Sequence, residues 1–310
     1  MAKIDLYNDD CLNVLHSMSD NSIQLMVTSP PYFNAREYSQ YVDLDEYKSI
    51  MKTIFTEVYR VLENHRYIVV NVGDILAQVG HQKSVRRRLA LGAYFTIMLQ
   101  EIGFIFIDDY IWDKGEPQSK RNVGNPPYPL YNYPINCYEH ILIMAKHEED
   151  KQKINCPICN SDKVVNNGFT SIGVFSFECK NPECTIKSNK GRGKRFSALT
   201  VMRDKYKTDN NKIDEELLKL FRRDIVKINP VIKINNKKEN LYKHSAPYPL
   251  EIPNMAIQFF TGENDTVMDC FMGSGTTGVI CKKYNRNFIG IELNQEYFEV
   301  AKNRIETEEI

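Results

Sequence analysis

Residues 266–278, TVMDCFMGSGTTG, decide the fold of this chain. The apolar run 266–269 predicts a short buried strand, and the glycines after it let the backbone turn tightly into a helix that starts near Thr276. Such a turn presents backbone N–H groups to a ligand at the positive end of the helix. The stretch therefore predicts a strand–turn–helix unit that holds the polar end of a nucleotide-like cofactor.

Two further features narrow the class of cofactor. The turn lacks the lysine of a phosphate-binding loop. A second apolar strand, residues 288–292, ends in Glu292, whose carboxylate is suited to accept hydrogen bonds from both hydroxyls of a ribose. The alternative for Glu292 is an ordinary surface residue after a strand.

The alternation of strands and helices extends to both sides of this unit. Further strands are predicted at 23–27, 68–72, 104–112 and 140–145, and helices at 46–62, 89–102, 214–227, 251–260, 276–284 and 294–306. Strands that alternate with helices predict a doubly wound α/β domain. Residues 151–235 lack this pattern over most of their length. We therefore expect two catalytic-domain segments, 1–150 and 236–310, separated by an inserted module at 151–235.

The strand at 23–27 leads directly into Thr28-Ser29-Pro30-Pro31-Tyr32. The Ser29 hydroxyl and the Pro30 carbonyl are suited to accept hydrogen bonds from an exocyclic amine, which frees the nitrogen lone pair for attack. The two prolines fix the backbone and remove amide donors that would compete for these acceptors. Tyr32 offers a ring on which an extruded base can stack. These residues predict chemistry on the amino group of a nucleobase.

With TSPPY before DCFMGSGTT, the chain resembles the beta-class amino-methylating DNA methyltransferases of restriction–modification systems. The similarity extends over residues 4–146 and 240–306 and includes the blocks Asn71-Val72-Gly73-Asp74, Trp112-Asp113-Lys114-Gly115 and Tyr138-Glu139-His140. The resemblance implies a Rossmann-like fold that binds S-adenosylmethionine, and methyl transfer to a flipped base in a short duplex DNA site. It also implies a companion restriction endonuclease.

The resemblance carries functional residues over to this chain. Asp9 replaces the glycine that is usual beside the adenine-binding acid, so Asp9 and Asp10 both stay candidates. Cys270 stands where the family often has proline. The catalytic candidates are Ser29, Pro30, Pro31 and Tyr32, and the cofactor-binding candidates are Asp10, Tyr248, Pro249, Asp269, Phe271, Gly273, Ser274, Gly275, Thr276 and Glu292.

The resemblance also favours one target base. Within the family, serine at the first position of the catalytic motif accompanies mainly N4-cytosine methylation and aspartate N6-adenine methylation. We expect cytosine, with adenine as the alternative. The chain has no Pro-Cys dipeptide, which argues against cysteine-dependent C5 methylation. A non-catalytic DNA-binding protein, or a methyltransferase that acts on RNA or on a protein glutamine, fits the same motifs less well.

A second stretch, Asn125-Pro126-Pro127-Tyr128, fits the general pattern of the catalytic motif. It lies in a loop rich in proline, asparagine and tyrosine and does not end an apolar strand. We interpret it as a wall of the active-site cleft, or as a rigid surface loop.

Four of the eight cysteines gather in the insert, in a CxxC pair and a more widely spaced pair. Thiolate pairs joined by a short β excursion are typical of closed, structural zinc sites. The segment resembles DNA-binding zinc ribbons, and it stands where this family inserts its target-recognition region. We expect Cys156, Cys159, Cys179 and Cys184 to bind zinc, and Arg86, Arg87, Arg88, Lys187, Lys190, Arg192, Lys194 and Arg195 to contact DNA. Solvated basic residues on a metal-stapled scaffold are the alternative.

Composition limits the remaining possibilities. Among 310 residues, Lys plus Arg and Asp plus Glu each number 40, so the net charge gives no sign of a nucleic-acid partner. The sequence has no apolar run of about 18 residues, as a membrane span requires. The first residues lack the basic and apolar regions of a signal peptide. We expect a cytoplasmic protein.

Overall fold

The computed structural model describes residues 2–33, 41–78, 86–115, 129, 136–148, 153–170, 173–184, 195–231 and 247–308. Contacts between Cα atoms divide the chain into two units. The larger unit is Met1–Lys146 together with Ile213–Ile310, and the smaller is His147–Lys212. Both ends of the chain therefore build one unit, into which the smaller one is inserted.

An eight-stranded sheet forms the centre of the larger unit. β7 runs antiparallel to β3 and β6, and the other neighbouring strands are parallel. A separate antiparallel pair is formed by β4 (Ile75–Gln78) and β5 (Arg86–Leu89). The order of the main sheet is β1 (Ile4–Tyr7), β13 (Asn287–Ile291), β12 (Thr266–Asp269), β2 (Ile23–Thr28), β3 (Leu62–Val72), β7 (Tyr138–Ala145), β6 (Ile105–Asp113) and β11 (Ile225–Lys227).

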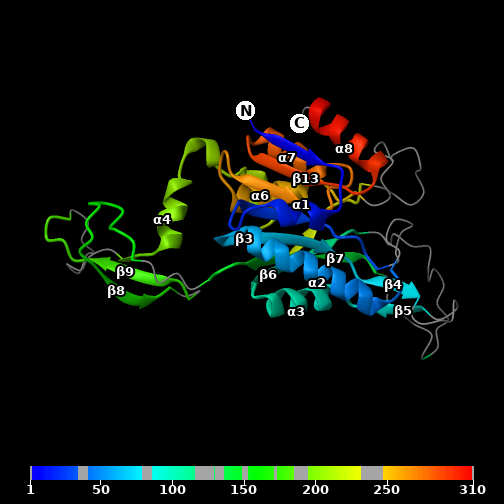
Figure 1. The fold of residues 1–310 in the computed structure, drawn as a ribbon, viewed down its shortest axis with the longest axis horizontal. Helices are drawn as coiled ribbons and strands as arrows, with labels where there is room; N and C mark the ends of the chain where they lie inside the picture. Colours follow the sequence, from blue (N-terminus) through cyan, green and yellow to red (C-terminus); the bar gives the residue numbers. More distant parts are fainter. Residues whose placement is uncertain are drawn as a thin grey trace. The chain divides into compact units, whose positions relative to one another are not determined.

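Helices cover both faces of this sheet (Figure 1). One face packs against α1 (Cys11–Ser17), α2 (Leu44–Val61) and α3 (Leu91–Ile102). The other packs against α6 (Glu251–Phe260), α7 (Thr276–Lys283) and α8 (Gln295–Thr307).

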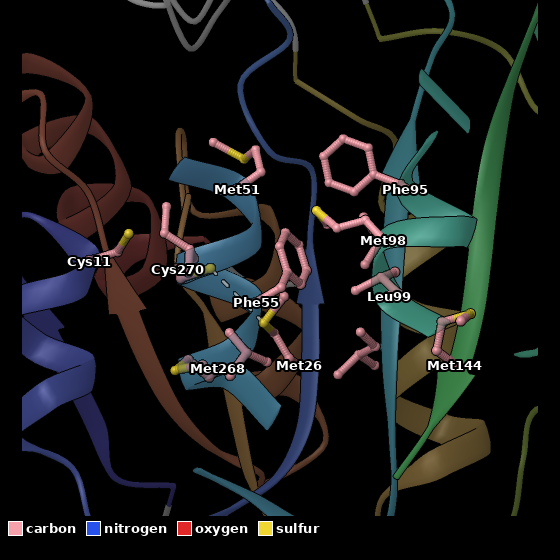
Figure 2. Packing of buried hydrophobic residues seen from close by; sticks show 14 of the residues in the cluster. Cys11, Met26, Met51, Phe55, Phe95, Met98, Leu99, Met144, Met268 and Cys270 are labelled. Carbon is pink, nitrogen blue, oxygen red and sulfur yellow. Dashed lines mark hydrogen bonds between the residues drawn. The ribbon is translucent and has the colours of Figure 1, made fainter. Parts of the chain in front are cut away.

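Each face has its own hydrophobic core because side chains alternate along a strand. On β2, Met26 belongs to the core under α1–α3, whereas Leu25 and Val27 belong to the core under α6–α8. Sulfur is plentiful in the first core (Figure 2), where the Cys270 thiol lies 3.9 Å from the Met26 sulfur. Flexible thioethers can fill irregular gaps in such a core.

The doubly wound α/β fold predicted from the sequence is confirmed. All but one of the predicted elements are present, most with ends shifted by one or two residues and β3 starting six residues early. The single helix predicted at 214–227 is wrong. A short helix, α5 (Glu215–Leu220), is followed by β11, which pairs with the end of β6. The β-branched residues Ile225 and Val226 fit that extended strand.

The smaller unit has its own antiparallel sheet. β9 (Phe175–Cys179) lies between β8 (Val164–Phe169) and β10 (Arg195–Phe196), followed by α4 (Ala198–Lys205) and the short 3-10 helix η1 (Asp209–Asn211). The unit ends at Lys212, whereas the sequence predicts an insert that extends to residue 235. Residues 213–231 belong to the larger unit because β11 extends its sheet and Leu217 and Phe221 pack in its second core.

In the part of the chain that the structure describes, no helix is long and apolar enough to cross a membrane.

Candidate active site

The two sequence motifs meet at one edge of the central sheet. β2 and β12 are parallel neighbours, so TSPPY and the glycine turn both follow the carboxyl ends of adjacent strands. The Thr28 hydroxyl donates a 2.6 Å hydrogen bond to Asp269 Oδ1. Two segments 241 residues apart are thereby fixed to each other. In a doubly wound sheet this edge is where ligands bind.

Asp269 is the centre of this connection. It is fully buried, and its carboxylate accepts hydrogen bonds from Thr28, Thr277, Tyr248 and the Phe271 amide. Burial raises the pKa of Asp269, and these donors oppose the rise. The cofactor contact predicted for Asp269 from the sequence stays a prediction. The hydrogen bonds also give Asp269 a structural role, because they tie the turn to β2 and to Tyr248.

Asp269→Asn is expected to lower the free energy of unfolding by about 2 kcal/mol, because the amide nitrogen cannot accept the bonds that the carboxylate accepts and leaves buried donors unpaired. Urea unfolding followed by circular dichroism measures the change. Asp209→Asn, at an exposed carboxylate paired with Lys212, is the matched control and is expected to have little effect. Equal stabilities of the two variants would contradict the role of Asp269.

The glycine turn has an unusual backbone conformation, and its polar side chains are buried. Gly273 and Gly275 have φ of 54° and 79°, and a Cβ at Gly275 would lie 3.1 Å from the Ala301 side chain. Ser274 and Thr276, predicted as cofactor contacts, are buried. Arg304 Nη1 donates to the Ser274 carbonyl at 3.2 Å and to the Thr276 hydroxyl at 3.0 Å. The turn is therefore held from α8, and the amides at the start of α7 are the groups that it can offer to a ligand.

Tyr248 and Pro249 pack beside this turn and are both buried. The Tyr248 hydroxyl donates to Asp269 Oδ2 at 3.2 Å and also contacts the Thr277 hydroxyl. Burial raises the pKa of Tyr248. The two residues line a cavity of about 210 Å³, together with Thr276 and Arg304. Phe271 is half-buried and packs against the first core.

Carboxylates stand at the ends of the next two strands. Glu292 is half-buried after β13, and it accepts hydrogen bonds from the Gly273 and Asn294 amides, each at 2.9 Å. Burial raises its pKa. Asp10 follows β1 and is exposed, where it caps α1 by accepting from the Leu12 amide at 2.8 Å. The exposed Asp9 accepts from the Asp10 amide at 2.7 Å. The structure thus places Glu292, Asp10 and Asp9 at the sheet edge that carries the turn.

The catalytic candidates follow β2. Pro30 is buried, and Ser29, Pro31 and Tyr32 are half-buried. The Tyr32 hydroxyl donates a 3.0 Å hydrogen bond to Glu139 Oε2. Burial, and next the Glu139 charge, raise the pKa of Tyr32, whereas the nearby polar groups of Ser29 and Gly73 oppose the rise.

Sequence reasoning missed four polar residues that hold the site. Glu139 accepts from Asn71 at 3.1 Å and forms an ion pair with Lys114. Arg304 supports the glycine turn. A signal existed for three of them, because Asn71, Lys114 and Glu139 lie in blocks shared with the methyltransferases. For Arg304 the sequence held no such signal, because it showed only a charged residue near the apolar positions Ala301 and Ile305.

The four predicted metal ligands come together in the smaller unit. Their sulfur atoms all lie within 4.8 Å of one another. Cys156 and Cys184 are 3.9 Å apart, and Cys159 and Cys179 are 3.7 Å apart. A tetrahedral site with Zn–S bonds of about 2.3 Å separates its sulfurs by about 3.8 Å, so the cluster fits zinc.

The structure describes only some of the residues that are predicted to contact DNA. Arg195 and Arg88 are exposed, and Arg195 Nη2 lies 3.4 Å from Asn167 Oδ1. Arg86 and Arg87 belong to β5. Lys187, Lys190, Arg192 and Lys194 lie outside the described residues, as does the Asn125–Tyr128 stretch. Trp112, at the end of β6, is buried and donates to the Ile228 carbonyl.

Comparison with known proteins agrees with this architecture. The type II beta methyltransferase M.BslI of Bacillus sp. (strain NEB-606) is 32% identical over 308 residues, which are 98% of this chain and 28% of M.BslI. The chain therefore spans less than a third of that relative. The Thermus thermophilus DNA modification methylase TTHA0409, complexed with S-adenosyl-L-methionine, has a TM-score of 0.61 at 20% identity over 98% of this chain and 95% of its own. The PvuII DNA methyltransferase (cytosine-N4-specific) has a TM-score of 0.57 at 19% identity over 98% and 86%.

These two structures share the fold of the chain. The N6/N4 methyltransferase family model, described as DNA methylase, matches residues 23–303, which extend from β2 into α8. The chain belongs to the N6/N4 DNA methylase family.

Proposed function

We propose that this chain is a DNA methyltransferase that transfers a methyl group from S-adenosylmethionine to the N4 amine of a cytosine flipped out of duplex DNA. The observation that carries the proposal is the 2.6 Å hydrogen bond between Thr28 and Asp269. It fixes the amine-binding motif beside the cofactor turn, and methyl transfer requires the two reactants to be held in line.

The residues of the turn suit the proposed cofactor. Backbone amides at the start of α7 suit its carboxylate, Glu292 suits the ribose hydroxyls, and Asp10 or Asp9 suits the adenine amine. Tyr248 and Pro249 line the cavity beside the turn. S-adenosylmethionine, when bound, supplies an electrophilic methyl group on a sulfonium.

The catalytic motif prepares the nucleophile. The Ser29 hydroxyl and the Pro30 carbonyl accept hydrogen bonds from the base amine, so that its lone pair leaves conjugation with the ring. The Tyr32 ring stacks on the flipped base, and the hydrogen bond to Glu139 fixes the orientation of that ring. Serine at this position supports cytosine, and the name of the PvuII enzyme, cytosine-N4-specific, is consistent with that choice.

The charge distribution supports DNA recognition by the insert. The smaller unit, residues 147–212, carries 13 lysines and arginines and eight aspartates and glutamates, whereas the rest of the chain carries 27 and 32. A neutral chain therefore has an insert with an excess of five positive charges. Basic residues of the insert pair with phosphates and hold the duplex. A restriction endonuclease of the same specificity is the proposed partner, in keeping with the type II relative.

The product identifies the reaction. DNA from cells that express the protein is digested to nucleosides and analysed by mass spectrometry, with a host that lacks its own DNA methylases as background. N4-methylcytosine is expected. N6-methyladenine would keep the chemistry and overturn the choice of base, and the absence of both would contradict the function. Cells that express Ser29→Ala are the control.

A further inference from the structure

The small sheet of the insert has one face that packs in the cysteine core and another that carries Arg195. Val165 on β8, Glu178 on β9 and Arg195 on β10 lie opposite one another in the register of the three strands. Side chains alternate along a strand, so these three share one face. Their neighbours Phe177 and Phe196 point to the other face and pack in the core beside the cysteines. Arg195 therefore lies on the face of the sheet that the cysteine cluster does not use.

A chain of hydrogen bonds holds the Arg195 side chain on this face. The Glu178 side chain is only 11% exposed, and its carboxylate accepts from Asn167 Nδ2 at 2.9 Å and from Lys180 Nζ at 2.8 Å. Asn167 Oδ1 in turn accepts from Arg195 Nη2 at 3.4 Å. A carboxylate paired with a lysine accepts and does not donate, so Asn167 must turn its NH₂ group toward Glu178 and its oxygen toward Arg195. The acid thus fixes the amide, and the amide fixes the guanidinium.

Most of the Arg195 guanidinium stays available to a partner. The side chain is exposed, and one of its five N–H groups is committed to Asn167. Among the described residues of the insert, ion pairs join lysines to acids, and Arg195 takes part in none of them. The unit that carries it has an excess of five positive charges, which suits a negatively charged partner.

We propose that Arg195 recognises the edge of a guanine in the major groove of the DNA, with Asn167 and Glu178 as its positioning residues. This inference deepens the proposed function and rests on it. In the major groove guanine presents two neighbouring acceptors, N7 and O6, and an arginine presents parallel donors and no acceptor. The groove is also wide enough to admit an antiparallel β-ribbon, such as two strands of this sheet.

The support that Arg195 receives favours a base over a phosphate. A phosphate presents oxygens in several directions, so a flexible basic side chain can pair with it from many positions. Two hydrogen bonds to guanine require one plane and one direction of the guanidinium. A side chain held in that direction beforehand loses less conformational entropy when it makes them. Arg203, which is exposed on α4, receives no such hydrogen bond from the described residues.

Duplexes that lack one guanine acceptor test this recognition. The site is first mapped by sequencing the methylated positions in DNA from cells that express the protein. Methylation kcat/KM is then measured on a duplex with this site, and on duplexes in which 7-deazaguanine replaces each guanine outside the reacting base pair in turn. This analogue keeps Watson–Crick pairing and lacks N7. Wild type is compared with Arg195→Ala and Asn167→Ala, and Arg203→Ala is the matched control because it removes the same charge from the same unit. Circular dichroism and thermal unfolding check that each variant is folded.

At one guanine, 7-deazaguanine is expected to lower the kcat/KM of the wild type by about 5- to 150-fold, the range of one specific base contact. Arg195→Ala is expected to lose a similar factor on the natural duplex and to show no further fall at that guanine, because the two changes remove the same contact. Asn167→Ala leaves Arg195 without its support and should weaken the sensitivity at the same position only. Arg203→Ala should keep the wild-type sensitivity at every guanine.

Two results would overturn the inference and leave the methyltransferase intact. One is a folded, active Arg195→Ala variant that keeps the wild-type sensitivity at every guanine, whether its kcat/KM is unchanged or falls uniformly as after loss of a phosphate contact. The other is a wild type that no 7-deazaguanine affects. Full sensitivity in Asn167→Ala would overturn the positioning role. A wild type that binds cofactor and duplex but methylates neither base would overturn the proposed function, and the inference with it.

Discussion

Ser29→Ala is expected to slow single-turnover methyl transfer by about 10²–10³-fold, which corresponds to about 3–4 kcal/mol of transition-state stabilisation. The substitution removes an acceptor that is proposed to align the base amine. That contact strengthens as charge develops on the nitrogen, so the loss falls on the chemical step. The affinity for S-adenosylmethionine is expected to stay within about twofold, because the turn is built on β12 and Ser29 follows β2.

The measurement is rapid-quench methylation with excess enzyme, which separates chemistry from product release. Ser22→Ala is the matched control, since it removes the hydroxyl of an exposed serine beside the opposite end of the same strand. Its rate should equal that of the wild type. An unchanged rate for Ser29→Ala would show that the motif does not bind the reacting amine.

Local sequence signals were enough to predict that the two motifs lie at the same edge of the sheet. The strand 266–269, its glycines and α7 form one continuous unit whose hydrogen bonds and turn geometry depend on neighbouring residues. TSPPY follows its strand in the same way. Since parallel strands present their carboxyl ends at one edge, two such units in one sheet predict a shared site without knowledge of the packing.

Contacts between distant segments were beyond the same reasoning. Glu139 reaches Tyr32 because β7 is antiparallel and starts at the edge where the other strands end, and no local pattern states that direction. Asp269 accepts hydrogen bonds from Thr28 and Tyr248, which lie in two other segments of the chain, and no local pattern predicts these contacts. The strand β11 was predicted as helix because its pairing with β6 lies more than a hundred residues away.

Cys156→Ser is expected to abolish zinc binding and to unfold the smaller unit while the larger unit keeps its affinity for S-adenosylmethionine. In the described part of the smaller unit, the core is small: Val164, Phe177 and Phe196 pack around Cys156, Cys179 and Cys184. A core of this size supplies little stability, whereas structural zinc contributes about 10–16 kcal/mol in comparable small domains. We therefore expect the free energy of folding of this unit to depend on the metal.

Metal analysis of the purified wild type should give about one zinc per chain, and Cys156→Ser should give none. Hydrogen exchange is expected to rise throughout 153–184 in that variant and to stay unchanged in β2 and β12. Cys137→Ser, outside the cluster, is the control and should keep its zinc.

DNA affinity should fall in Cys156→Ser, and with it the dependence of affinity on salt, because the basic residues of the insert lose their common scaffold. A zinc-free wild type that still protects 153–184 from exchange would contradict the metal site, and unchanged DNA affinity in Cys156→Ser would separate the insert from recognition of the duplex.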